Sequence, residues 1–362
     1  MNARRNAGMR ALRTLTLFSV LCLAAAGALP AREKPIRVGT TAANFLEYGY
    51  GAAGSAMGDA CVSVPRGLAS VYWNPAGFGL AERNEAYFVY QPWLAGIQTS
   101  LVSAGVVLPT IGNLAFSLIY VNYGDMEVTT MASQEGTGAF FSAADVAASA
   151  TYSRAITDWF AFGASLKLVS SRIWHMTANA VAVDLGVLIR TGFFSPTGAA
   201  QDGLNLGMSV SNYGTRMRYS GIDLRHPIDI LPEEAGNFKN VPGDFHTEGW
   251  ELPLIFRLGV CLNVAKGEHH SLVLAADALH PNNNSESVNL GAEETFRLTN
   301  TFSFSVRVGY KALFMEESQY GLSFGAGLEM LMFGNRGVRL DYAYRGMSIL
   351  GSTDSFGLSV FF

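Results

Sequence analysis

From Glu85 onward, side chains alternate between apolar and polar in segments of about ten to fifteen residues, which is the two-residue period of a β-strand. Residues 301–311 (TFSFSVRVGYK) show this pattern clearly. One face carries Phe302, Phe304, Val306, Val308 and Tyr310, and the other carries Ser303, Ser305, Arg307, Gly309 and Lys311. Strands of membrane barrels alternate in this way between lipid and lumen, so we expect the first set to face lipid.

The same division recurs in two further segments, with the charged residues on the expected lumen side. In the first, Val338, Leu340, Tyr342 and Tyr344 oppose Arg339, Asp341 and Arg345. In the second, Leu252, Leu254, Phe256, Leu258 and Val260 oppose Arg257, Gly259 and Asn263. The pattern predicts an all-β fold, a transmembrane antiparallel β-barrel.

Composition excludes a helical membrane protein and disfavours an ordinary soluble domain. Hydrophobic residues make up 49% of the chain and charged residues only 15%, against roughly 25% charged in typical soluble domains. Beyond the N-terminus, however, no stretch approaches the roughly 20 consecutive apolar residues that a spanning helix needs. A chain that is apolar without such stretches is expected to cross the membrane with strands.

The N-terminus has the layout of a secretory signal peptide. Residues 1–13 carry four arginines and no acidic residue, and residues 14–29 form an apolar core that ends in small residues. We expect residues 1–31 to be the signal peptide, with cleavage after Ala28 or Ala31. Cys22 lies in the middle of the core after Leu21, which argues against lipid attachment. The mature protein is expected in the bacterial outer membrane.

The alternating segments number about fourteen, an even count that would place both ends of the barrel on the periplasmic side. The predicted strands are 85–92, 95–108, 113–123, 142–156, 159–174, 179–191, 203–212, 250–264, 270–280, 286–297, 301–311, 319–332, 337–345 and 352–362. Short gaps alternate with long ones such as 124–141 and 213–249, as periplasmic turns alternate with extracellular loops. Only the turn 192–202 is longer than expected.

Residues 32–84 lack the lipid-type alternation and are rich in glycine and alanine. Because this segment precedes the first strand and its small residues permit close packing, we predict an N-terminal plug or hatch inside the lumen. The barrel itself is assigned to residues 85–362.

Several motifs resemble the PorV/PorQ family of outer-membrane proteins, which belongs with the FadL-like barrels. They are GAAGSAMGDACVSV, YWNPAG, YVNYGDMEVTT, GTGAFFSAADVAASATYSRAITD, ALHPNNNSESVNLG and LDYAYRGMSILGSTDSFGLSVFF. The resemblance covers nearly the whole mature chain and implies a fourteen-stranded barrel with an N-terminal hatch. Relatives often carry acidic residues between the AMG and YWNPAG motifs, whereas this chain has Pro65, Arg66 and Gly67, which questions a role for hatch carboxylates.

Charge and motif content argue against nucleic-acid binding and catalysis. Without the four N-terminal arginines the chain has 21 basic and 29 acidic residues, so it offers no basic surface for phosphates. None of its six histidines falls in a G-x-S-x-G, HExxH or similar motif, so we expect no enzyme, no metal site and no cofactor. Cys61 and Cys261 are too few for a disulfide framework; one bridge is possible, and two free thiols are favoured.

Two sets of candidate functional residues follow from the predicted strands. The expected lumen-facing polar residues are Lys167, Asp184, Arg190, Arg257, Arg307, Asp341 and Arg345. They either line a polar path or pair with one another to fill the barrel, and we favour pairing. The second set is the turn Asn74, Pro75, Ala76 and Gly77, which is either a hinge of the hatch or simply a good turn sequence.

Two functions remain open. The resemblance to PorV/PorQ implies a protein-binding barrel linked to type IX-like secretion, whose partners would be exported proteins or subunits of the secretion machinery. The loop 213–249, with Trp250 at its edge, is the docking candidate for such a partner. The FadL-like fold instead implies passive transport of small hydrophobic molecules through the hatch and a lateral or periplasmic opening. In both cases outer-membrane lipid surrounds the barrel.

Overall fold

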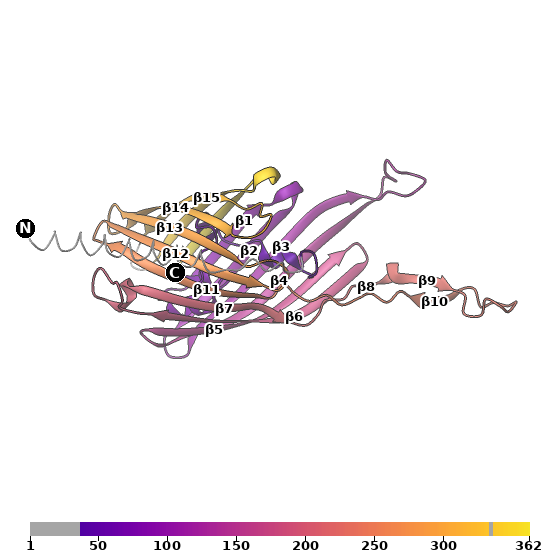
Figure 1. The fold of residues 1–362 in the computed structure, drawn as a ribbon, viewed down its shortest axis with the longest axis horizontal. Helices are drawn as coiled ribbons and strands as arrows, with labels where there is room; N and C mark the ends of the chain where they lie inside the picture. The colour runs from indigo at the N-terminus through magenta and orange to yellow at the C-terminus, as the bar shows by residue number, and fades with distance from the viewer. Residues whose placement is uncertain (1–36, 333–335) are drawn as a thin grey trace, which may run out of the picture.

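The computed structural model describes residues 37–332 and 336–362. The predicted signal peptide, residues 1–31, lies outside this range. Within it, fourteen strands form one antiparallel barrel (Figure 1). They are β1 (Glu85–Pro92), β2 (Gln98–Leu108), β3 (Gly112–Glu127), β4 (Phe140–Thr157), β5 (Phe160–Ile173), β6 (Met176–Arg190), β7 (Leu204–Gly214), β11 (Ile255–Lys266), β12 (His270–Pro281), β13 (Ser287–Arg297), β14 (Phe302–Leu313), β15 (Leu322–Leu331), β16 (Gly337–Gly346) and β17 (Ser352–Phe361).

The sheet closes on itself between its first and last strands. β1 pairs with β17 in the register Glu85↔Phe361 to Tyr90↔Phe356, and β7 pairs with both β6 and β11. Closure leaves the barrel without an unpaired edge, which is what a sheet in lipid requires. The fold is therefore the predicted fourteen-stranded antiparallel barrel of an outer-membrane protein. No helix in the described ranges is long and apolar enough to cross a membrane.

The two faces of the strands agree with the alternation. On β14, Val306, Val308 and Tyr310 are between 37% and 45% exposed, whereas Arg307 is only 3% exposed. One assignment was wrong: Leu252 is buried, not lipid-facing. The reason is that β11 begins only at Ile255, and residues 250–254 form an irregular connection in which Leu254 N donates to Leu252 O.

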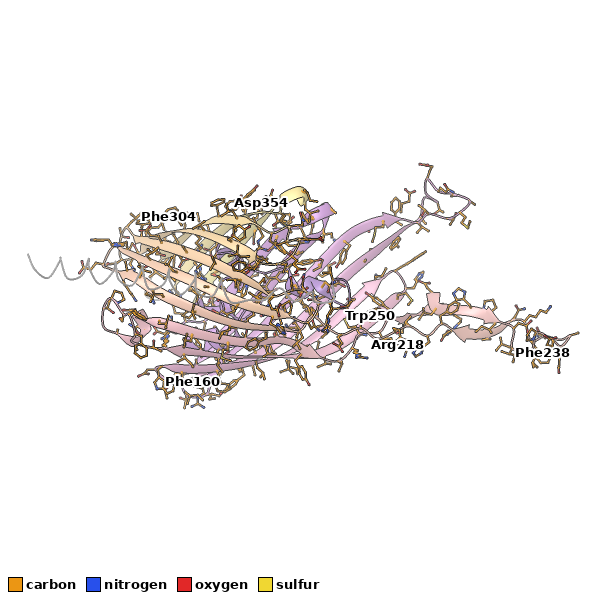
Figure 2. The ribbon with its side chains drawn as sticks, viewed as in Figure 1. Phe160, Arg218, Phe238, Trp250, Phe304 and Asp354 are labelled. Carbon is orange, nitrogen blue, oxygen red and sulfur yellow. The ribbon has the colours of Figure 1, made fainter. Side chains whose placement is uncertain are left out.

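The long loop predicted at 213–249 contains secondary structure that the sequence analysis missed. β8 (Ser220–Gly221) extends the barrel by pairing with β6, η6 (Ile222–Leu224) follows, and β9 (Arg225–Ile228) pairs with β10 (Val241–Asp244). We call residues 213–249 the arm. It projects beyond the barrel, at the end away from the C-terminus, with Phe238 far from the barrel (Figures 1 and 2). Short turns η4 (Leu94–Gly96), η5 (Ala200–Asp202) and η7 (Ser348–Leu350) lie in other connections.

The oversized turn 192–202 is held by a local cluster. Asp202 pairs with Lys266 of β11 and accepts a hydrogen bond from Thr197 Oγ1 at 2.6 Å. These contacts explain how a long connection can remain compact at the short-turn end of the barrel.

Four short helical turns precede β1: η1 (Asn44–Glu47), α2 (Ala52–Ala56), η2 (Gly67–Ser70) and η3 (Pro75–Leu80). We call residues 44–80 the N-terminal segment. Its backbone bonds to inward-facing side chains from widely separated strands: Gly58 N donates to Ser323 Oγ of β15, and Val62 N to Asp277 Oδ2 of β12. The segment thus occupies the lumen; whether residues 32–84 act as a plug or hatch stays a prediction.

Glycines in the barrel wall allow this segment to approach closely. A Cβ atom at Gly309 would lie 2.1 Å from Gly58 N, and one at Gly163 would lie 2.4 Å from the carbonyl carbon of Pro75. No side chain can occupy such a space without displacing backbone. The N-terminal segment and the wall are therefore fitted to each other at backbone distance.

Candidate functional site

Most of the predicted lumen-facing charges are paired. On one wall, Arg307 Nη1 contacts Asp341 Oδ1 at 2.7 Å, and the same guanidinium pairs with Glu293. Arg66 of the N-terminal segment also binds Glu293, with 2.8 Å between Nη1 and Oε2. A chain of buried ion pairs therefore links the segment to β13, β14 and β16.

Asp59 is a second anchor of the N-terminal segment. Its carboxylate contacts Arg345 Nη2 at 2.6 Å and Lys311 Nζ at 2.7 Å. Burial opposes ionisation of Asp59, but the two cations outweigh burial and lower the pKa of this carboxyl below its ordinary value. The N-terminal segment thus carries a buried carboxylate, although residues 65–67 are not acidic.

The opposite wall carries a smaller cluster. Lys167 Nζ lies 2.8 Å from Asp184 Oδ2 and 2.6 Å from Asn212 Oδ1, and Asn212 N donates to Asp184 Oδ1. All three side chains are buried. Like the network on the first wall, this cluster supports the prediction that the lumen charges pair with one another. It argues against the alternative of an open polar path.

Arg190 and Arg257 behave differently from the other predicted residues. Arg190 is half-buried near the end of β6, and its Nε has no hydrogen-bond partner among the described residues. Arg257 is only 5% exposed, and its Nη1 donates to the neutral Ser211 Oγ at 2.7 Å. Across the described part of the chain, no carboxylate oxygen lies within 4.0 Å of the Arg257 guanidinium.

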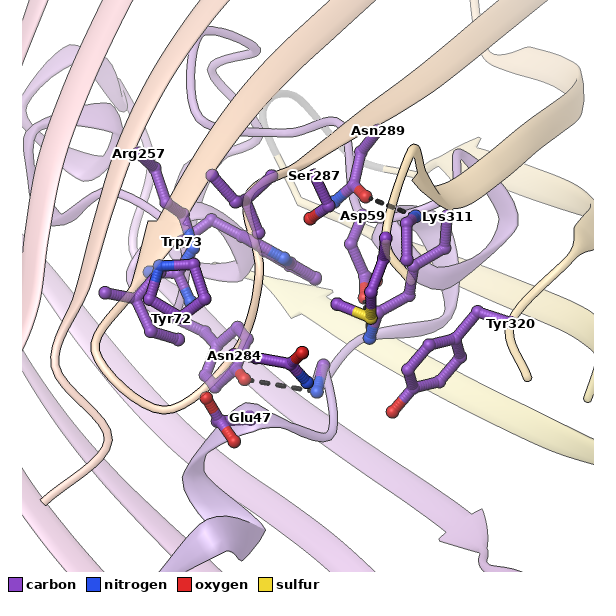
Figure 3. Close-up of a pocket in the computed structure, with 16 residues that line it drawn as sticks. Glu47, Asp59, Tyr72, Trp73, Arg257, Asn284, Ser287, Asn289, Lys311 and Tyr320 are labelled. Atoms are coloured by element: carbon purple, nitrogen blue, oxygen red, sulfur yellow. Dashed lines mark hydrogen bonds and ion pairs between the residues drawn. The ribbon is translucent and has the colours of Figure 1, made fainter. Parts of the chain in front are cut away.

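Arg257 faces a cavity of about 120 Å³ between the N-terminal segment and strands β11–β14 (Figure 3). Tyr72, Trp73, Ile255, Leu279, Met315 and Tyr320 supply apolar surface. The charged residues on the lining are Glu47, Asp59, Arg257 and Lys311. Much of the lining comes from strand ends and loops opposite the chain ends, so the cavity lies toward the extracellular side.

The turn Asn74–Gly77 is fixed against the wall. Asn74 caps η3 by accepting a hydrogen bond from Ala76 N, and its Nδ2 donates to Val62 O and to Val187 O of β6. Ser153 Oγ of β4 donates to Pro75 O at 2.6 Å. These bonds account for the turn structurally; a hinge role stays a prediction.

Sequence reasoning missed several members of the network, above all Asp59, Arg66 and Glu293. Glu293 stood inside the predicted strand 286–297, and Asp59 was the single charged residue in AMGDACVSV. Both residues could therefore have been recognised as candidates from the sequence. What the sequence did not reveal was which strand each residue of the N-terminal segment would meet.

Comparisons with known proteins identify solved structures that share this fold. No family model matches the chain, and no curated protein matches it, so membership of the PorV/PorQ family stays a prediction. The chain is similar in structure to the toluene transporter TodX of Pseudomonas putida, at 14% identity and a TM-score of 0.53 over 86% of this chain and 97% of that one.

Two further solved structures show the same similarity. The toluene transporter TbuX of Ralstonia pickettii has 10% identity and a TM-score of 0.51, covering 86% of this chain and 97% of that one. A FadL homologue of Pseudomonas aeruginosa has 12% identity and a TM-score of 0.50, covering 86% and 98%. The fold is thus that of the FadL-type barrels, and the protein is a barrel of the bacterial outer membrane.

Proposed function

We propose that this barrel lets small hydrophobic compounds cross the outer membrane passively. The observation that carries the proposal is the cavity of about 120 Å³ inside a barrel whose fold is shared with toluene transporters. A dry cavity of ~150 Å³ holds one benzene ring, so the volume suits a compound of about that size. Tyr72, Trp73 and Tyr320 supply aromatic surface for such a ring.

The filling of the rest of the lumen favours a narrow, selective path and argues against a wide pore. The N-terminal segment and the buried ion pairs fill part of the interior. A solute that enters from the extracellular side would meet the cavity of about 120 Å³ on its way past the segment. Onward passage requires the segment or the wall to move.

Uptake of labelled toluene by intact cells tests the proposal. Lipopolysaccharide-bearing cells are needed because a pure phospholipid bilayer already admits toluene. Cells that produce the barrel should take up toluene faster than cells without it. Ser287→Trp, which would fill the cavity, should reduce the rate to that of cells without the barrel, whereas Val288→Trp on the neighbouring outward position should not. Equal uptake with and without the barrel would contradict the proposal.

A second candidate is the protein-binding function implied by the PorV/PorQ resemblance. The arm favours it, because Ile228 of the isolated pair β9–β10 and Phe245 directly after β10 are 43% and 63% exposed. Two-stranded sheets are marginally stable alone, so a partner would stabilise this one. Comparison of the surface proteome with and without residues 222–246 tests this function. An unchanged set of exported proteins would remove its support.

A further inference from the structure

Among the described residues, the buried Arg257 has no carboxylate oxygen within 4.0 Å of its guanidinium, and it lines a cavity with room for an anion; Glu47 and Asp277 act on it only at longer range. The two carboxylates on the lining are already engaged: Asp59 is shared by Arg345 and Lys311, and Glu47 Oε2 accepts a hydrogen bond from Asn283 Nδ2 at 3.1 Å. Asp277, at the diagonal position on the neighbouring strand β12, accepts a hydrogen bond from Val62 N at 2.9 Å, and no ion pair within 4.0 Å joins it to Arg257. A guanidinium removed from water in this way is costly unless an anion compensates it.

From this geometry we infer that the cavity binds a small aromatic carboxylate, whose carboxylate pairs with Arg257 and whose ring packs on the aromatic lining. The inference rests on the proposed function and extends its substrate class from neutral hydrocarbons to single-ring aromatic acids. The planar guanidinium can hold both oxygens of a carboxylate at once. Only Nη1 is engaged within the described chain, by Ser211.

Volume limits the ligand to one ring. A cavity of about 120 Å³ is no larger than the ~150 Å³ cavity that binds benzene, so a fused ring system or a long acyl chain would not fit without rearrangement. Tyr72 and Trp73 meet edge to face, with ring centroids 5.1 Å apart, and present a rigid aromatic corner beside Arg257. On the other side of the cavity, Lys311 Nζ lies 4.2 Å from the centroid of the Tyr320 ring and stays bound to Asp59.

Glu47 lines the same cavity as Arg257 and is held by the hydrogen bond from Asn283. Burial raises the pKa of Glu47, while that hydrogen bond and the charges of Lys311 and Arg257 work in the other direction.

Binding of benzoate and of benzyl alcohol to the full-length protein in detergent tests the inference. The two probes are similar in size, and only benzoate is charged at pH 7. Isothermal titration should show one saturable benzoate site, with benzyl alcohol bound at least about tenfold more weakly. Equal affinity for the two probes would overturn the inference without the need for any variant.

Arg257→Gln should weaken benzoate binding by at least about tenfold and leave benzyl alcohol binding unchanged. Arg190→Gln is the control, because it removes a second arginine, half-buried at the end of β6, that does not line the cavity. Unaltered benzoate binding in Arg257→Gln would contradict the assignment. Failure of benzoate to bind while toluene uptake persists would refute the inference alone; benzoate binding without toluene uptake would refute the proposed function.

Discussion

Cys61 and Cys261 lie in one buried cluster that joins the N-terminal segment to β11. Both are free thiols, which agrees with the alternative favoured from the sequence. Burial raises the pKa of the Cys61 thiol to about 12, with a smaller opposing effect from Arg66. Because the thiolate is the reactive form, native Cys61 should be inert at pH 7.

The corresponding prediction concerns alkylation by maleimide. Protein without residues 1–31, and hence without Cys22, should react at neither remaining cysteine when folded in detergent, whereas after unfolding it should take up two maleimide groups, counted by intact-mass spectrometry. Ser133→Cys, on an exposed loop, should be labelled at once in the folded state. Absence of labelling after unfolding without reductant would instead reveal a disulfide bridge.

Asp59 offers a test of the buried ion pairs. Asp59→Asn would leave Arg345 and Lys311 without their shared carboxylate and should lower the free energy of unfolding by about 3–5 kcal/mol, measured by urea titration. Asp244→Asn on the arm, whose pair with Arg225 is exposed, should change it by less than about 1 kcal/mol.

The pH dependence has a definite sign. The folded state lowers the pKa of Asp59 below 3.8. The contribution of Asp59 to the free energy of unfolding is therefore fully present above that pH, and it is lost as the pH falls through the lowered pKa. The stability difference between wild type and Asp59→Asn should therefore shrink only in acid below pH 3.8. A difference that was already gone at pH 6 would show that the ion pairs contribute little.

At the scale of elements, the wall glycines determine where the N-terminal segment can sit. Gly309→Val would place side-chain atoms against Gly58 and Met57, so the segment should detach locally while the barrel still forms. The readout is maleimide labelling of Cys61 in the folded protein, which should become measurable. Gly192→Val is the control, since no atom lies within 4 Å of a Cβ there; equal labelling of both variants would contradict the close fit.

The strands were predictable because their alternation has a single strong cause, lipid on one face and a filled lumen on the other. β1 matches its predicted bounds of 85–92, and the other barrel strands differ by a few residues at their ends. The arm was not predictable in this way: β9 and β10 have only four residues each and stand in water, where no burial imposes a period.

The candidate site was predictable only in part. Lys167, Asp184, Arg307, Asp341 and Arg345 followed from their place on the polar face of a strand, and the structure pairs all of them. Asp59, which pairs with Arg345, and Arg66, which pairs with Glu293, lie in the N-terminal segment, which has no periodic pattern to fix its path. The cavity beside Arg257 depends on the path of the N-terminal segment through the lumen, so no local sequence pattern predicts it.

At the scale of the whole molecule, we expect the barrel to be closed to ions while it admits the proposed hydrophobic compounds. Backbone contacts between the N-terminal segment and the wall, together with buried ion pairs on two walls, oppose a continuous aqueous channel. Porins of similar strand number owe their conductance to a water-filled lumen.

Conductance of the full-length protein in a planar lipid bilayer tests this claim most directly. The account predicts no steady ion current through the wild-type barrel and the appearance of current in Gly309→Val, where the N-terminal segment loses its fit. A steady, porin-like current through the wild type would contradict the account, because it would require an open lumen where the structure places the segment.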